Sequence, residues 1–446
     1  MFQQWQRYSV YKDSGIEWLG EIPEHWVVIK LKYNVTVNPS KDGYFDKKAT
    51  DLTTFLPMEK VSKDGIVDYS IKKPVCDLID GFTYFRQNDI IFAKITPCFE
   101  NGKGAFINKL DTNYGFGSTE FHVLRAKKNI APLFVFFITK SQGFLKIGEA
   151  FMTGSAGQKR VSTDFVSEFK ITSPPLIEQK AIARFLDRET AKIDTLIQKK
   201  KRLIELLQEK RTAIINQAVT KGLNPGVPMK DSGIEWLGEI PEHWGVKRLK
   251  FILAEPLKYG ANESAQLNDR DCPRFIRITD IAEDGSLRED TFKSLPEDIA
   301  KPFILKIGDL LFARSGATVG KTFMYREYWG RACYAGYLIR ARLNLDKTVP
   351  EFISYFANSS VYWNWISSIL IQATIENVSA EKYANLFLSL PLVEEQKTIT
   401  RFLDRETTKI DTLMAKTRTS IEKFQEYRTA LISAAVTGKI DVRNNP

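Results

Sequence analysis

The sequence contains the same fifteen-residue segment twice, and this feature constrains the fold more than any other. Lys12–Trp26 and Lys230–Trp244 both read KDSGIEWLGEIPEHW. A second block follows each copy, with RFLDRET at 184–190 and again at 401–407. Two stretches of nearly equal length, about 27–173 and 245–390, lie between these blocks and have largely diverged. The chain is therefore a duplication in which one common frame carries two different modules.

Each repeated C-terminal block has the pattern of one long helix. Pro174 and Pro175 end the preceding strand, and Glu178 falls in the first turn, where the helix dipole favours a negative charge. Apolar residues then recur at heptad spacing, which is typical of a coiled-coil seam. The predicted seam consists of Leu186, Ile193, Leu207 and Ile214 in the first helix, and Leu403, Ile410, Phe424 and Leu431 in the second, with breaks at Lys200 and Thr417. Gly222 and Gly438 are expected to end the helices, each roughly 40 residues and about 60 Å long.

A single helix of this kind cannot bury its seam alone, so we expect the two helices to pair with each other, antiparallel. The alternative is that each helix packs on its own module or on a partner protein. Strand-like runs at Ile90–Ile95, Phe121–Arg125 and Tyr337–Arg342 indicate mixed modules with antiparallel strands. The predicted fold class is α+β: two similar mixed α/β domains separated by a long antiparallel two-helix coiled coil, with internal pseudo-twofold symmetry. The predicted boundaries are a first domain at 1–174, a helical region at 175–222, a linker and second domain at 223–390, and a second helical region with the C-terminal tail at 391–446.

The net charge of +10 is concentrated in the two helical blocks. Residues 179–222 contain 11 Lys+Arg and 5 Asp+Glu, and residues 396–439 contain 9 and 5. Subtracting both blocks from the totals of 64 and 54 leaves 44 of each sign, so the rest of the chain is neutral. A basic balance favours an anionic partner such as nucleic acid, although solvated helix faces would carry the same excess.

Cysteine and hydropathy patterns place the protein in a reducing, aqueous compartment. Cys76, Cys98, Cys272 and Cys333 are far apart and form no C-x-x-C pair, which indicates reduced thiols rather than a disulfide framework or a zinc site. No apolar run approaches the roughly 20 residues that span a bilayer, and the N-terminus has no signal-peptide pattern. We therefore expect a cytoplasmic protein. The three histidines, His25, His122 and His243, have no metal-ligand spacing, so no metal site is expected.

Three enzymatic interpretations are weak. The segment SGATVGKT at 315–322 resembles a P-loop, but its first glycine is displaced and Thr322–Tyr325 predicts a strand where a P-loop needs a helix. Amino-methyltransferases need an Asn/Asp-Pro-Pro-aromatic motif, which this chain lacks. An E-x-K spacing at Glu178–Lys180 and Glu395–Lys397 occurs at helix starts, where a capping role suffices. We expect a non-catalytic chain.

The repeated motifs together resemble a known family. These motifs are DSGIEWLGEIPEHW, the strands DIIFAK at 89–94 and GDLLFAR at 308–314, and a helix that begins at PLIEQK or PLVEEQK and continues through RFLD. All are present twice, and the order resembles that of type I restriction–modification specificity subunits over nearly the whole chain. Asn88 is a minor departure, since the second copy has Gly308 at this place.

The resemblance implies two target recognition domains, each binding one half of a bipartite, asymmetric DNA sequence, with the helices as a ruler between them. It also implies two adenine methyltransferase subunits and motor–nuclease subunits as partners. In this family the cofactors S-adenosylmethionine, ATP and Mg²⁺ belong to the partners, so no cofactor is expected in this chain. A coiled-coil adaptor without a DNA role, which would give no gel shift, and a P-loop-like NTPase built on Gly320–Thr322 stay as alternatives.

Basic and polar turn residues of the modules are the predicted DNA contacts. In the loop Thr153–Arg160, Gln158 suits adenine, Arg160 suits guanine and Lys159 suits a phosphate. The matching place in the second module, Thr374–Asn377, has a different chemistry. The full set of predicted contacts is Lys94, Lys103, Gln158, Lys159, Arg160, Arg314, Lys321, Glu376 and Asn377. An ordinary exposed loop would have a similar composition, and the aromatic helix Tyr355–Ile366 is expected to be core rather than a base-stacking platform.

Overall fold

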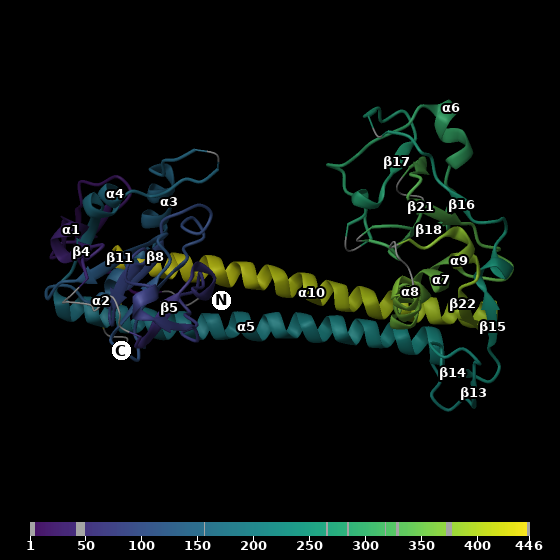
Figure 1. Cartoon of the computed structure of the whole chain (residues 1–446), viewed down its shortest axis with the longest axis horizontal. Helices are drawn as coiled ribbons and strands as arrows, with labels where there is room; N and C mark the ends of the chain where they lie inside the picture. Colours follow the sequence, from purple (N-terminus) through teal and green to yellow (C-terminus); the bar gives the residue numbers. More distant parts are fainter. Residues whose placement is uncertain are drawn as a thin grey trace. The chain divides into compact units, whose positions relative to one another are not determined.

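The computed structural model describes residues 5–41, 50–155, 157–264, 266–282, 285–316, 318–326, 330–371 and 377–443. The chain forms two compact units, one of residues 1–201 with 417–446 and the other of residues 202–416. Two long helices, α5 (Leu176–Lys221) and α10 (Val393–Val436), contribute to both units (Figure 1). The boundaries between the two compact units therefore fall inside both helices, whereas the boundaries predicted from the sequence keep each helix in one segment.

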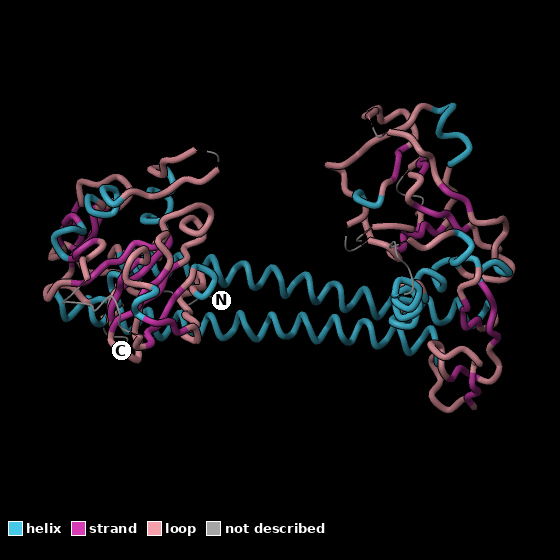
Figure 2. The backbone as a smooth tube through the Cα atoms, in the orientation of Figure 1, coloured by secondary structure: helices cyan, strands magenta, loops and turns pink. Residues whose placement is uncertain are grey.

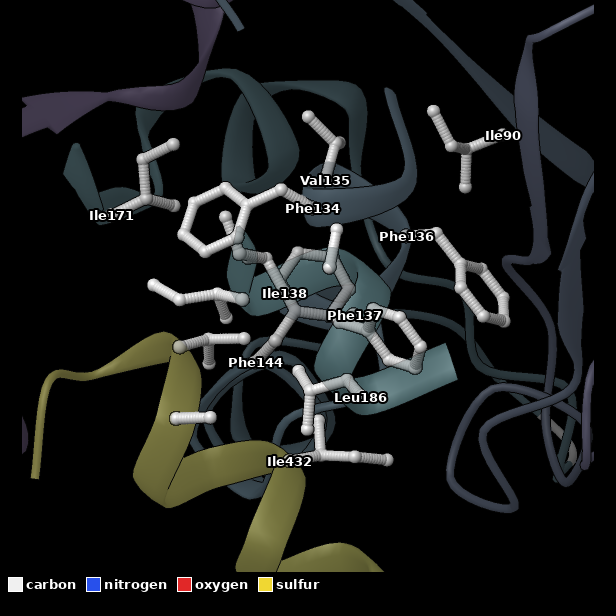
Figure 3. Packing of buried hydrophobic residues seen from close by; sticks show 14 of the residues in the cluster. Ile90, Phe134, Val135, Phe136, Phe137, Ile138, Phe144, Ile171, Leu186 and Ile432 are labelled. Atoms are coloured by element: carbon white, nitrogen blue, oxygen red, sulfur yellow. The ribbon is translucent and has the colours of Figure 1, made fainter. Parts of the chain in front are cut away.

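In the first unit, the start of α5 packs against the end of α10. Arg428 on α10 donates to both carboxylate oxygens of Asp194 on α5, at 2.9 and 3.2 Å. Leu186 of α5 and Ile432 of α10 lie in the same hydrophobic core (Figure 3). Because residues near the start of one helix contact residues near the end of the other, the two helices are antiparallel here.

The second unit holds the other halves of the same helices in the same relation. Arg211 on α5 donates to Asp411 on α10 at 3.0 Å. Leu207 packs with Ile410 and Met414 in a small buried cluster between the helices. The antiparallel intramolecular pairing predicted from the heptad pattern is therefore confirmed in each unit.

The structure places all eight predicted seam residues in hydrophobic cores. Leu186, Ile193, Leu207, Leu403, Ile410 and Leu431 are buried, and Ile214 and Phe424 are partly buried against the same clusters. At the predicted breaks, the ammonium of Lys200 lies 5.7 Å from the ring centroid of Phe424, and Thr417 is buried. A lysine is tolerated in the seam because its stem covers apolar surface while its charge faces an aromatic ring.

The module of the first unit is built on two four-stranded sheets. One has the order β4 (Val35–Val37), β11 (Phe121–Ala126), β8 (Ile90–Ala93) and β9 (Gly104–Phe106), and all its neighbours are antiparallel. The other has the order β6 (Lys72–Pro74), β5 (Leu52–Leu56), β10 (Tyr114–Gly117) and β7 (Thr83–Arg86), with β5 and β10 parallel. The strands are short and joined by longer loops (Figure 2), as the Gly/Asn/Asp turns predicted.

Helices cover the first sheet and connect it to the long helices. Phe134 and Phe137 from α2 (Pro132–Thr139) and Phe144 from α3 (Gln142–Ala150) pack in one core with Leu186 of α5 (Figure 3). The remaining elements of this unit are β1 (Tyr11–Asp13), β2 (Glu21–Pro23), β3 (Val27–Lys30), α1 (Leu31–Asn34), α4 (Thr163–Glu168), β12 (Lys170–Ser173), and the 3-10 turns η1 (Met58–Lys60) and η2 (Val75–Asp77).

The module of the second unit repeats the antiparallel sheet of the first, and a two-stranded parallel sheet takes the place of the other four-stranded sheet. Its four-stranded antiparallel sheet has the order β16 (Lys258–Tyr259), β21 (Leu338–Ala341), β18 (Leu310–Ala313) and β19 (Thr322–Met324). The strands β17 (Arg274–Ile276) and β20 (Ala332–Tyr334) pair in parallel, as β5 and β10 do in the first unit. The remaining elements are β13 (Met229–Asp231), β14 (Glu239–Pro241), β15 (Gly245–Arg248), η3 (Leu249–Ile252), η4 (Ile278–Asp280), α6 (Glu297–Ala300), η5 (Lys301–Phe303), α7 (Pro350–Phe356), α8 (Ser360–Ile371), α9 (Ala380–Ala384) and β22 (Phe387–Leu390). The predicted fold class of two similar mixed domains and a long antiparallel helix pair is confirmed.

One prediction about this module was wrong in its extent. The aromatic run Tyr355–Ile366 is not one helix, because α7 ends at Phe356 and α8 begins at Ser360. Ser359 breaks the run, since its hydroxyl donates to the carbonyl of Phe356 and accepts from the N–H of Tyr362 at the start of the next helix. The expected core role is nevertheless observed, with Tyr362, Trp365 and Ile366 buried.

A buried aspartate precedes an inner strand of the antiparallel four-stranded sheet in each unit. Asp89, directly before β8, accepts from Nε and Nη2 of Arg125 at 2.9 Å each, and Asp309 before β18 is bound in the same way by Arg342 at 2.9 and 2.7 Å. A bidentate arginine satisfies the buried carboxylate and fixes its direction. Glycine or asparagine precedes each aspartate because φ is positive there, +69° at Asn88 and +85° at Gly308.

Candidate nucleic-acid interface

In the first unit, several of the predicted DNA-contacting residues meet where β8 ends. The N–H of Lys94, one residue past the strand, donates to the carbonyl of Glu120 at 2.8 Å, and the carbonyl of Lys94 accepts from Val161 at 2.9 Å. The carbonyl of Lys103 accepts from Ala93 at 2.9 Å, and Arg160 forms a β-bridge with Ile95. These backbone contacts bring four polar residues together, which we call the first strand-end cluster: Lys94, Lys103, Glu120 and Arg160.

The side chains of this cluster differ in their exposure and in the contacts that they already make. Arg160 is 42% exposed and forms a bidentate ion pair with Glu120, with 3.0 Å from Nε to Oε2 and 2.7 Å from Nη2 to Oε1. These hydrogen bonds hold the pKa of Glu120 below its ordinary value, so the carboxylate is ionised at neutral pH. Lys103 donates to the carbonyl of Met58 at 3.0 Å and is committed to a contact inside the module. Gln158 and Lys159, in the loop that leads into Arg160, are exposed.

The second unit has the same backbone geometry at the end of β18. Arg314 donates its N–H to the carbonyl of Tyr337 at 3.0 Å and accepts from Val378 at 2.8 Å. The carbonyl of Lys321 accepts from Ala313 at 2.8 Å, and Asn377 forms a β-bridge with Ser315. The second strand-end cluster therefore consists of Arg314, Lys321, Tyr337 and Asn377, at the positions of Lys94, Lys103, Glu120 and Arg160. Arg160 and Asn377, the last residues of the two loops predicted to correspond, do occupy equivalent places, and residues 374–376 lie outside the described residues.

The second cluster uses aromatic rings where the first uses an ion pair. The guanidinium of Arg314 lies 4.9 Å from the ring centroid of Tyr259, and Tyr337 is 68% exposed. Nε of Arg314 and Oδ1 of Asn377 are buried, and neither has a hydrogen-bond partner among the residues that the structure describes. Buried polar atoms without a partner are costly, so a polar ligand or water that reaches them would be stabilised. Lys321 is exposed, and Glu376 lies outside the described residues.

Sequence reasoning found the basic members of both clusters but missed Glu120, Tyr259 and Tyr337. A signal for two of them was present. Glu120 and Tyr337 each stand one residue before a strand that pairs with the strand-end motif, so aligning the two copies strand by strand would have placed them opposite Lys94 and Arg314. Tyr259 had no such signal, because its contact with Arg314 depends on the register of β16 against β21.

The P-loop-like segment has the geometry of a hairpin. β18 and β19 are antiparallel neighbours, and the turn between them is closed by a hydrogen bond from Gly320 to the carbonyl of Ala313 at 2.9 Å. The carbonyl of Gly320 also accepts from the buried hydroxyl of Tyr362 at 2.7 Å. A P-loop presents backbone N–H groups at the start of a helix, whereas here a strand follows Lys321. The geometry therefore does not suit nucleotide phosphate binding.

The E-x-K segments join the repeated segment to the helix starts. Glu178 accepts from the hydroxyl of Tyr8 at 2.6 Å and lies 2.9 Å from Nε2 of His25. Glu395 lies 2.9 Å from Nε2 of His243 and accepts from Nε1 of Trp244 at 3.1 Å. Both carboxylates are engaged in these structural contacts with side chains of the repeated segment and its neighbours, rather than in the predicted capping of backbone N–H groups.

The glutamine next to each of these carboxylates has an equally specific structural role. Gln179 accepts from the N–H of Ala131 at 2.9 Å and donates to the carbonyl of Pro174 at 2.8 Å. Gln396 accepts from Val349 at 2.8 Å and donates to Pro391 at 2.9 Å. Each buried amide thereby fixes the start of a module helix, α2 or α7, to the start of a long helix.

Other chemistry-bearing groups form no site in the described part of the chain. All four cysteines are free thiols. The described residues contain no group of His, Cys, Asp or Glu side chains arranged to hold a metal ion. Among the described helices, none combines the length and the apolar character needed to cross a membrane. The strand-end clusters bring several of the predicted DNA-contacting residues together and include exposed members, such as Lys321 and Tyr337 in the second unit.

Comparison with protein families identifies the repeated architecture. A family model described as "Type I restriction modification DNA specificity domain" matches residues 23–206 and 242–423. Each matched range begins in a copy of the repeated segment and ends in a long helix. The two matches follow the duplication seen in the sequence and in the two units.

Several type I restriction enzyme specificity subunits are similar to the chain. It is 25% identical over 441 residues to the MjaVIII specificity subunit of Methanocaldococcus jannaschii, covering 95% of each protein. It is 26% identical over 440 residues to the EcoKI specificity subunit of Escherichia coli K12, covering 94% of this chain and 90% of that subunit. A 165-residue match to the E. coli EcoAI specificity subunit is 41% identical, but it covers 36% of this chain and spans only 27% of that subunit.

Solved structures share the fold. One chain, from work described as the structural basis of complex assembly and conformational transition of the type I R-M system, aligns with a TM-score of 0.73 at 17% identity, covering 93% of this chain and 98% of that one. The HsdS subunit from Thermoanaerobacter tengcongensis aligns with a TM-score of 0.52 at 17% identity, covering 94% and 98%. At this identity the likeness speaks for the fold.

Proposed function

The chain belongs to the family of type I restriction–modification specificity subunits, and from this premise we propose that each of its two modules reads one half of a bipartite, asymmetric DNA sequence. The proposal includes a non-catalytic role for the chain, which selects the site where partner subunits act. One observation carries it: the two strand-end clusters have the same backbone geometry but different side chains.

The equivalent positions of the clusters explain how one fold would read two different half-sites. Both clusters keep a cation directly after the central strand, Lys94 or Arg314, which suits a phosphate or a guanine. The neighbouring positions change chemistry, from Arg160 in the first unit to Asn377 in the second. Arginine suits guanine and asparagine suits adenine in the major groove, so the two halves of the target should differ in sequence.

The chain enters and leaves each module through one ladder of two strands. Val27 pairs with Ser173 in the ladder of β3 and β12, and Gly245 pairs with Leu390 in the ladder of β15 and β22. The two ends of each module are therefore adjacent, so a module can be exchanged at a ladder without changing the helices. This supports the view that the modules are recognition units on a common frame.

The repeated segment supports the proposed partners. Its buried residues, such as Trp26 and Trp244, are constrained by packing, but Glu17, Glu24 and their copies Glu235 and Glu242 are exposed and still identical. Identity at exposed positions is expected where two copies of one partner bind. We therefore propose two adenine methyltransferase subunits, joined by motor–nuclease subunits, as the partners. The proposal assigns S-adenosylmethionine, ATP and Mg²⁺ to those subunits.

A module exchange tests the proposal. Residues 245–390 would be replaced by the module of a relative with another target, and methylated adenines would be mapped genome-wide in cells that carry the complete system. One half of the methylated sequence should change while the other half is kept. The matched control replaces residues 27–173 and should change the opposite half. A target that changes as a whole, or does not change at all, would contradict the modular reading.

Gel shifts separate this function from that of an adaptor without a DNA role. The full chain with its methyltransferase partners should bind its target with an affinity that falls steeply with salt, because lysines and arginines displace counterions from phosphates. Replacing Lys94 or Arg314 by alanine should lower the salt slope by about one if the residue contacts a phosphate. An adaptor would give no shift at any salt concentration.

A further inference from the structure

The first strand-end cluster contains a carboxylate where a DNA-binding surface would be expected to carry none. Glu120 is 26% exposed and ionised, and it stands beside Lys94 and Arg160. A carboxylate near a polyanion is repelled, unless it accepts hydrogen bonds from donors on the DNA. The donors that duplex DNA offers in its major groove are the exocyclic amino groups of cytosine and adenine.

The geometry of the ion pair leaves both partners able to bind a ligand. Arg160 donates Nε and Nη2 to Glu120, which uses two of its five N–H donors. A carboxylate has about four acceptor sites, so Glu120 can accept from Arg160 and from a base at once. The pair also holds the guanidinium in one orientation, because two hydrogen bonds fix its plane.

We infer that Glu120 is a specificity-determining residue, which accepts a hydrogen bond from N4 of a cytosine in the first half-site while Arg160 donates to the guanine paired with it. The carboxylate and the guanidinium together match the donor and acceptor edges of one C·G base pair. This inference rests on the proposed function, since it assigns the chemistry by which the first module reads its half-site.

The second unit shows what the same position looks like without a carboxylate. Tyr337 occupies the place of Glu120, and Asn377 occupies the place of Arg160, so no ion pair forms there. The cation Arg314 instead lies over the ring of Tyr259. The pair Glu120–Arg160 is therefore not required by the common backbone geometry, which is kept at 2.8 and 3.0 Å between the two strand-end residues in both units. A feature that the fold does not need is more readily explained by what the module binds.

The test compares the full chain with the variants E120Q and E120A in cells that carry the complete system, by mapping methylated adenines. Glutamine can accept and donate, and it suits adenine. E120Q should therefore lower the preference for the original C·G pair about ten-fold and admit A·T at that position. E120A should relax the same position without a new preference. The second half-site should be read as before in both variants, which shows that they fold and assemble.

E168Q is the matched control, because Glu168 is also an ion-paired carboxylate of the first unit, 48% exposed and bound by Lys30 at 2.6 Å. It should leave the methylated sequence unchanged. The inference is overturned if E120Q and E120A both keep the original sequence, if either changes the second half-site, or if E120Q keeps the sequence while E120A abolishes methylation, since Glu120 would then only position Arg160. A different result, the absence of any bipartite methylation that depends on the unchanged chain, would refute the proposed function itself.

Discussion

The two glycines that end the long helices make a matched pair of substitutions that tests how the chain closes each unit. Gly222 and Gly438 both have φ of +73°, a conformation that costs an L-residue about 1 kcal/mol or more. Their surroundings differ. A methyl group at Gly438 would lie 2.4 Å from Cδ of Pro23 and 2.9 Å from Cζ3 of Trp26, whereas at Gly222 the nearest atom is Cζ2 of Trp244 at 3.3 Å.

These distances give different expected costs. Gly222→Ala should cost about 1 kcal/mol, mostly from the backbone, because a contact at 3.3 Å needs only a small shift. Gly438→Ala adds an overlap with two rigid, buried rings, and overpacking of this kind costs about 1–3 kcal/mol more. The total of about 2–4 kcal/mol corresponds to a roughly 30- to 1,000-fold larger equilibrium constant for opening of the segment that Gly438 contacts.

Hydrogen exchange measured by mass spectrometry locates the effect. Gly438 is followed by Lys439, whose ammonium donates to the carbonyls of Leu19, at 2.7 Å, and Glu21. Gly438→Ala should therefore raise exchange in the first copy of the repeated segment, and Gly222→Ala should raise it less and in the second copy. Peptides must extend past the repeat, since the two copies are identical. An equal effect of both variants, or faster exchange in the wrong copy, would refute the reasoning.

Three further predictions follow from contacts inside the units. Arg428→Ala should lower the free energy of unfolding by about 1–3 kcal/mol, because Arg428 is largely buried and bound to both oxygens of Asp194. Arg211→Ala should lower it by under about 1 kcal/mol, because Arg211 is more exposed, and denaturant unfolding of the two variants compares these effects. Gln179→Leu should cost about 2–4 kcal/mol, because it leaves a buried N–H and a buried carbonyl unpaired; thermal unfolding measures this, and an unchanged Tm would contradict it. Burial lowers the pKa of Lys140 to about 7, so between pH 7 and about 10 the unfolded chain holds a proton that the folded chain lacks. The free energy of unfolding should therefore rise with pH in this window. Denaturant unfolding at several pH values measures the rise, and Lys140→Met should remove it.

Much of the architecture was predictable because it depends on local patterns. The seven-residue spacing gave the two helices and their seam, and the duplication gave two modules of one fold. The strand-end motifs also indicated where the polar clusters lie, since Lys94 directly follows β8 and Arg314 directly follows β18. These features are readable because each is encoded within a short stretch of sequence.

The contacts that shape the candidate interface could not be predicted in the same way. Glu120 and Arg160 are 40 residues apart, and they meet only because the register of β8 with β11 and a β-bridge from Ile95 to Arg160 place them together. Strand register is set by packing across the sheet, not by local propensity. The stacking of Arg314 on Tyr259 fails to show in the sequence for the same reason.

The comparison of the two units separates the part of each module that must stay constant from the part that can vary. The contacts that recur in both units are made by buried groups: Asp89 with its arginine, Gln179 with the start of α2, and the ladder that closes the module. The contacts that differ are made by side chains at the strand ends, where the backbone alone holds the geometry. Such positions accept new side chains at a small cost to the hydrophobic core, because the strand-end geometry is held by backbone hydrogen bonds that any residue other than proline can make. Under the proposed function, such a scaffold would change the DNA sequence that a module reads while keeping the frame on which the partner subunits would bind.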